Sequence, residues 1–200
     1  MTKHDPMIAV LEKYIPWNTQ EEKDLPLLLY HLKNTPDVLE RKNNICHFTA
    51  SAWVVSQDHH YVLMAYHNIY DSWAWLGGHA DGETNLALTA KREALEESGL
   101  QDIRLVSEEP LSVEILTVNG HVKKGEYISS HLHLNVTYLL EADTNIPIAC
   151  LPEENSAVAW IPIEEISKRS SEPWFCAHIY SKLCEKTAKL YPLKENVCKK

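Results

Sequence analysis

Apolar and polar residues alternate along several short runs of this chain, which is typical of half-buried β-strands. Residues 131–140 (HLHLNVTYLL) alternate clearly, with His131, His133 and Asn135 on one face, and residues 47–55 (HFTASAWVV) alternate weakly. Residues 47–55 and residues 61–67 are together predicted to form a hairpin. Further strands are predicted around Trp73 and at residues 103–107, 111–118 and 157–161, and residues 121–127 are predicted to form a loop.

Helical patterns occur at both ends of the chain. Near the start, they predict helices at residues 6–15, from Thr19 through Leu32, and at residues 37–42. Near the end, they predict helices at residues 163–168 and 174–190. We therefore expect a helical N-terminal extension (residues 1–44) that covers one face of a domain formed by residues 45–200, or that mediates a dimer.

One more helix is predicted in the middle of the chain. Thr84 is its expected N-cap, Gly99 its expected C-terminal stop, and Leu88 and Leu95 are expected to face inward. Strands on both sides of this helix and a closing C-terminal helix predict an α/β fold, a three-layer α/β/α sandwich with a mixed β-sheet.

Three carboxylates share one turn of this central helix. Glu93 and Glu97 are four residues apart, and Glu96 lies three residues after Glu93. Such carboxylates repel one another unless solvent, basic groups or a divalent cation relieve the repulsion. Because Mg²⁺ prefers oxygen ligands, a few carboxylates together with substrate phosphates are a suitable site for it.

The stretch that contains these carboxylates, GGHADGETNLALTAKREALEESGL (residues 77–100), resembles the Nudix box, G-x5-E-x7-R-E-U-x-E-E-x-G-U, where U is a bulky aliphatic residue. The matching positions are Arg92, Glu93, Glu96, Glu97, Gly99 and Leu100. Thr84 stands where the pattern has its first Glu, and Ala94 stands where it has a bulky aliphatic residue. Arg92 is therefore expected to be held by Glu83 or Glu96.

The resemblance covers roughly residues 47–167 and implies a Nudix-type sandwich and an enzyme. The implied activity is a metal-dependent pyrophosphohydrolase that cleaves a nucleoside diphosphate linked to another moiety, by attack of water on phosphorus. The implied ligands of Mg²⁺ or Mn²⁺ are Glu93, Glu96, Glu97 and the Gly77 carbonyl, and Arg92 would orient a glutamate. The general base would be Glu93 or a loop glutamate, Glu153 or Glu154. The alternative function is a non-catalytic Nudix-fold sensor of a nucleotide ligand, which the intact box carboxylates disfavour.

Several residues outside the box are candidates for substrate binding. His131 and His133 are expected to line the pocket and donate to a phosphate or sugar; they are alternatively zinc ligands, together with His121, or part of an ordinary polar strand face. Trp75 is a candidate for stacking on a base, with packing as its alternative role.

Composition limits the partners. A net charge of −9 without a basic block argues against a general nucleic-acid binder. Five cysteines without a C-x-x-C motif indicate reduced thiols, and no apolar run is long enough for a signal peptide or a membrane span. We therefore expect a cytoplasmic protein that acts on a small nucleotide-like molecule, with no nucleic-acid or membrane partner and with a homodimer as an open alternative.

Overall fold

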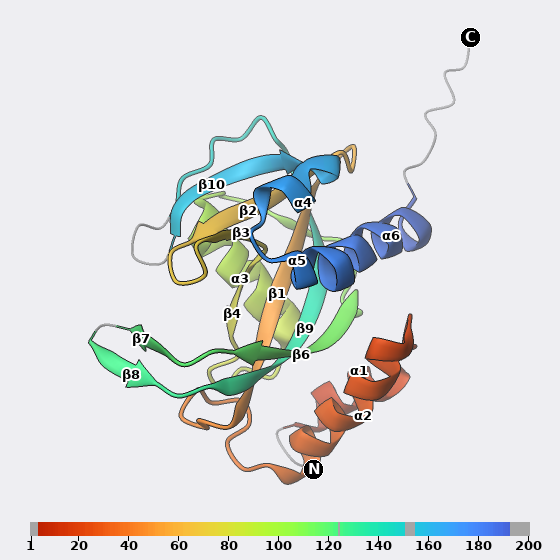
Figure 1. Cartoon of the computed structure of the whole chain (residues 1–200). Helices are drawn as coiled ribbons and strands as arrows, with labels where there is room; N and C mark the ends of the chain where they lie inside the picture. The colour runs from red at the N-terminus through yellow and green to blue at the C-terminus, as the bar shows by residue number, and fades with distance from the viewer. Residues whose placement is uncertain (1–3, 124, 151–154, 193–200) are drawn as a thin grey trace.

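The computed structural model describes residues 4–123, 125–150 and 155–192 (Figure 1). Its strands are β1 (Cys46–Ser56), β2 (Tyr61–His67), β3 (Ser72–Ala74), β4 (Leu76–His79), β5 (Arg104–Leu105), β6 (Ser112–Val118), β7 (His121–Lys123), β8 (Glu126–Ile128), β9 (His131–Ala142) and β10 (Asn155–Pro162). Its helices are α1 (Asp5–Lys13), α2 (Thr19–Asn34), α3 (Leu86–Ser98), α4 (Ile166–Arg169), α5 (Pro173–Phe175) and α6 (Ser181–Leu190). A 3-10 turn, η1 (Ile163–Glu165), precedes α4, and a π-helical turn, η2 (Cys176–Tyr180), joins α5 to α6.

Strand β1 lies at the centre of a mixed sheet. It pairs in parallel with β9 along its whole length and antiparallel with β2 and β4. The order across the sheet is β10-β2-β1-β9-β5, with β3 on β2, β4 on β1 and β6 on β9. The mixed sheet predicted from the alternating runs is confirmed.

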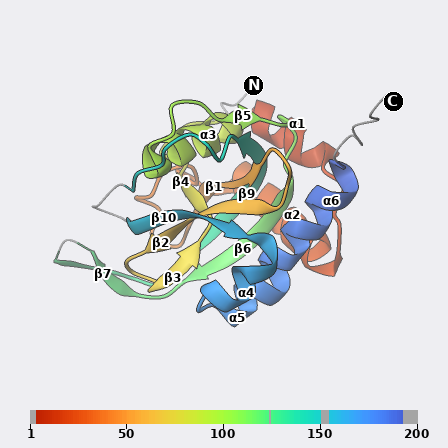
Figure 2. The same cartoon turned by 90° about the horizontal axis from the view of Figure 1, so that it is seen from above.

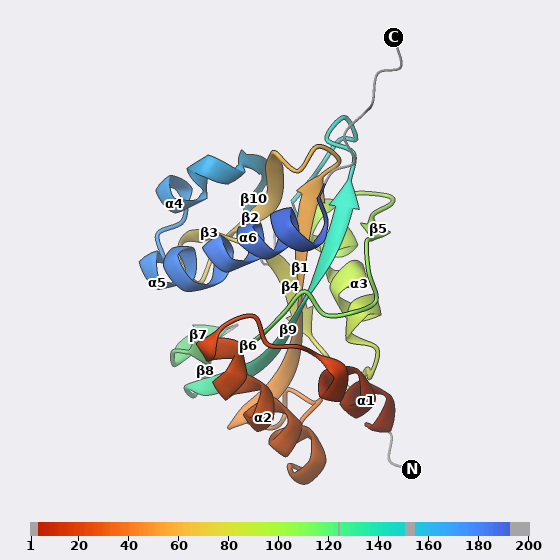
Figure 3. The same cartoon turned by 90° about the vertical axis from the view of Figure 1, so that its right-hand side faces the viewer.

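Helices cover both faces of this sheet. Helix α3 lies on one side of β1 and β9, whereas α5 and α6 lie on the other, as Figures 2 and 3 show. On the α3 side, Ala90 and Ala94 pack with the Phe48 face of β1. On the α6 side, Ile179 and Leu183 pack with Trp53. The expected α/β/α sandwich is therefore present, with one apolar core on each face of the sheet.

Alternation along β1 explains why the α6 side of the sheet is polar at one end. His47, Thr49 and Ser51 share a face with Trp53, because successive side chains of a strand point to opposite faces. The parallel pairing places His47 opposite His133, Thr49 opposite Asn135 and Trp53 opposite Leu139. One sheet face therefore changes from histidines to an apolar core along its length.

Helix α2 lies beside β6 and packs against α1, and both helices lie near the end of the sheet where β1 begins (Figure 3). Their buried apolar side chains join the core on the α3 face. These side chains are Met7, Leu11, Leu25, Leu28 and Leu32. Among the described helices, none has both the length and the apolar character that a membrane crossing requires.

Two local predictions about secondary structure are wrong. Residues 37–42 form turns instead of a helix, because Asp37 has a positive φ of 54° and the Val38 carbonyl accepts a hydrogen bond from the Phe48 N–H in β1. The part of residues 121–127 that the structure describes forms most of the paired strands β7 and β8 instead of a loop, and Gly125, just before β8, has a positive φ of 86° that favours glycine.

Two details of the central helix also differ from the prediction. Asn85, not Thr84, is the N-cap, and its side chain accepts a hydrogen bond from the Leu88 N–H at 3.2 Å. Leu88 is exposed instead of inward-facing, because the small Ala87, Ala90 and Ala94 form the buried face and let α3 approach the sheet closely. Gly99 ends the helix in the left-handed conformation, as expected.

Candidate functional site

A pocket of about 510 Å³ opens where the polar end of the sheet meets the acidic face of α3. It brings together most of the residues that the sequence singled out. The lining includes Trp75, Gly77, Gly78, Arg92, Glu93, Glu96, Glu97, His121, His131 and His133. It also includes Lys123, as well as His47, His79, Arg41 and Asp81, which the sequence did not predict as site residues.

Glu97 is the buried carboxylate of the box. Its Oε2 accepts a hydrogen bond from the Gly77 N–H at 2.8 Å, and its Oε1 accepts one from Asn155 Nδ2, also at 2.8 Å. Helix α3, β4 and β10 therefore each contribute to its position. A carboxylate that accepts a hydrogen bond at each oxygen has a defined orientation.

Arg92 lies between the other two box carboxylates. Its Nη2 is 2.7 Å from Glu93 Oε1, and its Nη1 donates to both carboxylate oxygens of Glu96 at 3.2 and 3.3 Å. Glu83 instead accepts hydrogen bonds from the Thr84 and Asn85 N–H groups at the start of α3. Arg92 is therefore held by Glu96, one of the two expected partners, and by its neighbour Glu93.

Gly77 and Gly78, at the start of the box stretch, allow the backbone of β4 to approach neighbouring groups closely. A Cβ at Gly78 would overlap the Glu93 carboxylate, and a Cβ at Gly77 would lie 2.5 Å from the Ala50 carbonyl oxygen. Only glycine fits either position without displacing β1 or the acidic face of α3.

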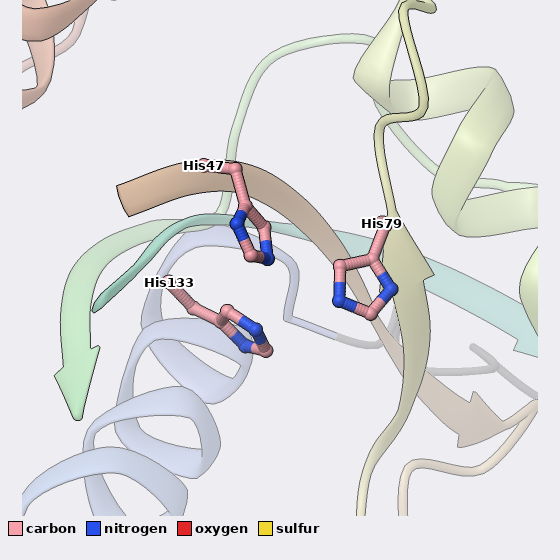
Figure 4. A group of neighbouring side chains, drawn as sticks. All are labelled: His47, His79 and His133. Atoms are coloured by element: carbon pink, nitrogen blue, oxygen red, sulfur yellow. The ribbon is translucent and has the colours of Figure 1, made fainter. Parts of the chain in front are cut away.

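Histidines form the opposite wall of the pocket. His47 from β1, His79 from β4 and His133 from β9 point toward one another (Figure 4), and one ring nitrogen from each lies within 4.8 Å of the others. His131 is adjacent, with its Nε2 3.2 Å from His133 Nε2. Burial lowers the pKa of His79 to about 3 and that of His133 to about 2, and it also lowers the pKa of His47. All three imidazoles are therefore neutral at pH 7.

Charged and aromatic side chains complete the lining. Arg41 Nε donates to Asp81 Oδ1 at 2.7 Å, and this hydrogen bond lowers the pKa of Asp81. Trp75 packs edge-on against Phe175 and Tyr180, with ring centroids 6.1 and 5.8 Å apart. Aromatic packing from η2 and α5 thus holds Trp75 at the pocket wall.

Among the residues that the sequence patterns did not reveal as part of this site are His47, His79 and Asn155. His79 lies inside the GGHADG loop, and His47 begins an alternating run, so both carried a visible signal. Asn155 carried no visible signal in the sequence, because it contacts Glu97, a residue 58 positions away along the chain. The predicted bases Glu153 and Glu154 lie outside the described residues.

Comparisons with known proteins agree with this geometry. The family model for the NUDIX domain matches residues 47–183. The crystal structure of the Nudix hydrolase RenU from M. smegmatis has a TM-score of 0.53 and 17% identity, covering 74% of this chain and 89% of that one. A NUDIX-family hydrolase from Clostridium perfringens has a TM-score of 0.48 and 20% identity, covering 68% and 95%. The dihydroneopterin triphosphate pyrophosphohydrolase of E. coli has a TM-score of 0.48 and 14% identity, covering 71% and 93%. None of the curated proteins compared with this chain matches it.

Proposed function

Because the chain belongs to the Nudix family, and is thus a hydrolase of diphosphate bonds, we propose that its activity depends on Mg²⁺ or Mn²⁺. We further propose that its substrate is a nucleoside diphosphate linked to another moiety. The observation that carries the proposal is Glu97, a buried carboxylate fixed at both oxygens on the wall of a pocket that Glu93 and Glu96 also line.

The donor set suits a hard cation. Glu93, Glu96, Glu97 and the Gly77 carbonyl offer only oxygen atoms, which Mg²⁺ and Mn²⁺ prefer. Gly78 leaves room for the Glu93 carboxylate against the backbone of β4. When bound, the ion neutralises charge on the diphosphate and acidifies the attacking water.

The chain's own residues would orient the reactants. The Gly77 N–H and Asn155 hold Glu97, and Arg92 holds Glu93 and Glu96. In the proposed reaction, a water oxygen attacks one phosphorus of the diphosphate, the bond from that phosphorus to the bridging oxygen breaks, and the other phosphate leaves together with the group attached to it. Glu93 or Glu154 accepts the proton of the water, as a general base must.

The rest of the pocket would bind the organic part and the phosphates of the substrate. Arg41 and Lys123 supply positive charge, and His131 and His133, the histidines expected to contact the substrate, lie on the pocket wall. Trp75 presents a rigid aromatic surface of the kind that stacks on a base. These groups suit a small nucleotide-like substrate, and we propose no nucleic-acid or membrane partner.

The test is hydrolysis with Mg²⁺ across a panel of nucleotides and nucleotide conjugates, followed by chromatography of both phosphate-containing products, with wild type beside Glu97→Gln. We expect metal-dependent product only with wild type, and at least a hundredfold loss of kcat in the variant, whose circular dichroism stays native. Glu185→Gln, an exposed glutamate on α6, is the matched control and should keep full activity. Comparing Glu93→Gln with Glu154→Gln would then identify the base.

Two outcomes would contradict the proposal. Full activity of Glu97→Gln would remove the box carboxylates from the reaction. No product across the panel, together with ligand binding in a thermal-shift assay, would favour the sensor alternative.

A further inference from the structure

Backbone pairing alone places three histidines on one face of the sheet. His47 on β1 is directly opposite His133 on β9, and His79 on β4 is opposite Thr49, the next residue of β1 on the same face as His47. The three rings therefore come from three adjacent strands, and Figure 4 shows them directed into one common space. A site built on paired strands holds its side chains more precisely than one built on loops.

The hydrogen bonds of His47 define which of its nitrogens is available. Its Nδ1 lies 2.9 Å from the Asn43 carbonyl oxygen, which can only accept, so Nδ1 carries the hydrogen. Its Nε2 then carries a lone pair, is buried, and has no hydrogen-bond partner among the described residues. Histidines that bind metal usually donate their other N–H to a carbonyl or carboxylate in this way.

His131 and His133 show a related arrangement. His131 Nδ1 lies 2.8 Å from the Ser129 carbonyl, so its Nε2 also carries a lone pair. That Nε2 is 3.2 Å from His133 Nε2. Two nitrogen ligands on a tetrahedral zinc ion are about 3.4 Å apart for Zn–N distances of about 2.1 Å. His131 is therefore positioned either to hydrogen-bond with His133 or to act as a further metal ligand.

The cluster has the wrong charge for a phosphate site and the right charge for a metal site. His47 is buried and His79 and His133 are half-buried, and this burial lowers the pKa of each ring, so at pH 7 the three neutral imidazoles bring no positive charge to attract a phosphate. A histidine binds a metal ion through a neutral imidazole. A ring that is already neutral can bind the ion without first losing a proton.

From this geometry we propose that His47, His79 and His133 bind a divalent transition-metal ion, best matched by Zn²⁺, at a site separate from the carboxylates of α3. Imidazole nitrogens suit Zn²⁺ and its neighbours, whereas Mg²⁺ prefers oxygen. Three histidines leave a fourth position for His131, a water molecule or a substrate oxygen, since the cluster lines the same pocket as the box. The inference does not rest on the proposed hydrolase activity.

The test is direct binding of Zn²⁺ to the full-length, EDTA-treated protein, by competition with a chromophoric chelator. We expect one tightly bound Zn²⁺ per chain, and the visible d–d absorption of tetrahedral Co²⁺ when Co²⁺ replaces it. His47→Ala and His133→Ala should each weaken binding at least a hundredfold and abolish the Co²⁺ bands. His60→Ala, an exposed histidine in the turn between β1 and β2, is the matched control and should bind as wild type does.

The box variant Glu97→Gln separates this site from the carboxylate site. It should keep the bound Zn²⁺ and the Co²⁺ bands even though it loses hydrolysis. If a histidine variant in β1 or β9 does not fold, His79→Gln on β4, which is less buried than His47, provides the same measurement. Absence of tight Zn²⁺ binding, unchanged binding in the histidine variants, or loss of binding in Glu97→Gln would each overturn the proposal.

Discussion

At the scale of single residues, contacts from distant parts of the chain determine the geometry of the acidic helix face. Thr84 replaces the first glutamate of the box, and Arg92 pairs with Glu93 and Glu96. Glu97 is held by Asn155, which is the first residue of β10 and is fully buried. Asn155 is thus a positioning residue, because its proposed effect on the metal acts through Glu97.

Replacing Asn155 by Ala removes a hydrogen bond that orients Glu97. Loss of such a supporting partner typically costs about 10–100-fold in metal affinity or activity. We expect the Mg²⁺ concentration for half-maximal activity to rise by about that factor, while KM for substrate at saturating Mg²⁺ changes little. Asn145→Ala is the control, since that side chain bonds only to the exposed Asp143 among the described residues. An unchanged Mg²⁺ dependence in Asn155→Ala would contradict the positioning role.

At the scale of elements, a buried network of charges joins α2 and α6 to the sheet. Lys186 Nζ donates to Glu21 Oε1 at 2.9 Å, and Lys182 Nζ donates to Glu114 Oε1 on β6 at 3.0 Å. All four side chains are at most 4% exposed. Burial alone would raise the pKa of Glu21, but Lys182 and Lys186 more than offset it and lower that pKa. The N-terminal helices are therefore coupled to the C-terminal helix by charge as well as by apolar packing.

Breaking one of these buried pairs leaves an uncompensated charge in the interior. Lys186→Met leaves Lys182 to compensate both Glu21 and Glu114, so one buried negative charge is uncompensated and we expect a loss of about 3–5 kcal/mol in the free energy of unfolding. Urea denaturation measures this loss. Lys189 lies about one turn after Lys186 on α6 and forms an exposed ion pair with Glu185. Lys189→Met breaks that pair and should lower the free energy of unfolding by about 1 kcal/mol or less. Equal effects of the two substitutions would contradict a structural role for the buried network.

At the scale of the whole molecule, the buried histidines link stability to pH. The pKa values of His79 and His133, about 3 and about 2 in the folded chain, lie below the ordinary value of 6.5. Between these values the unfolded chain binds more protons than the folded chain, so the folded state loses stability as pH falls below about 6.5. Glu21, with its lowered pKa, adds a second loss only below its ordinary value of 4.5.

In the presence of EDTA, we therefore expect the free energy of unfolding to decrease from pH 7.5 to pH 5. Each histidine contributes up to about 1.4 kcal/mol per pH unit below its unfolded pKa. Urea denaturation at several pH values measures the slope, and His133→Gln should flatten it by about that amount per unit. His60→Gln should leave it unchanged. A slope that is the same in His133→Gln as in wild type would show that His133 is protonated equally in both states.

Two expectations at this scale stay predictions. The division into an extension, residues 1–44, and a domain, residues 45–200, has no direct test, although the apolar residues of α1 and α2 lie in the same core as the sheet. The homodimer is likewise a prediction, which sedimentation of the full-length chain would decide.

The sequence by itself determined the local features of this protein. Alternation located β1, β2, β6, β9 and β10, helical periodicity located α3 and α6, and the spacing of Arg92, Glu93, Glu96 and Glu97 indicated the family. These patterns depend on residues a few positions apart, whose relative orientation a helix or strand dictates.

Only the tertiary structure decided which distant side chains meet. The register of β1 with β9 and β4 brings His47, His79 and His133 together, and β10 brings Asn155 to Glu97. A shift of one residue in either strand pairing would turn a histidine to the opposite face of the sheet. The local pattern of apolar and polar residues favours one face of the sheet for each side chain, but which strands pair, and which residues lie opposite one another, depends on packing of the complete core.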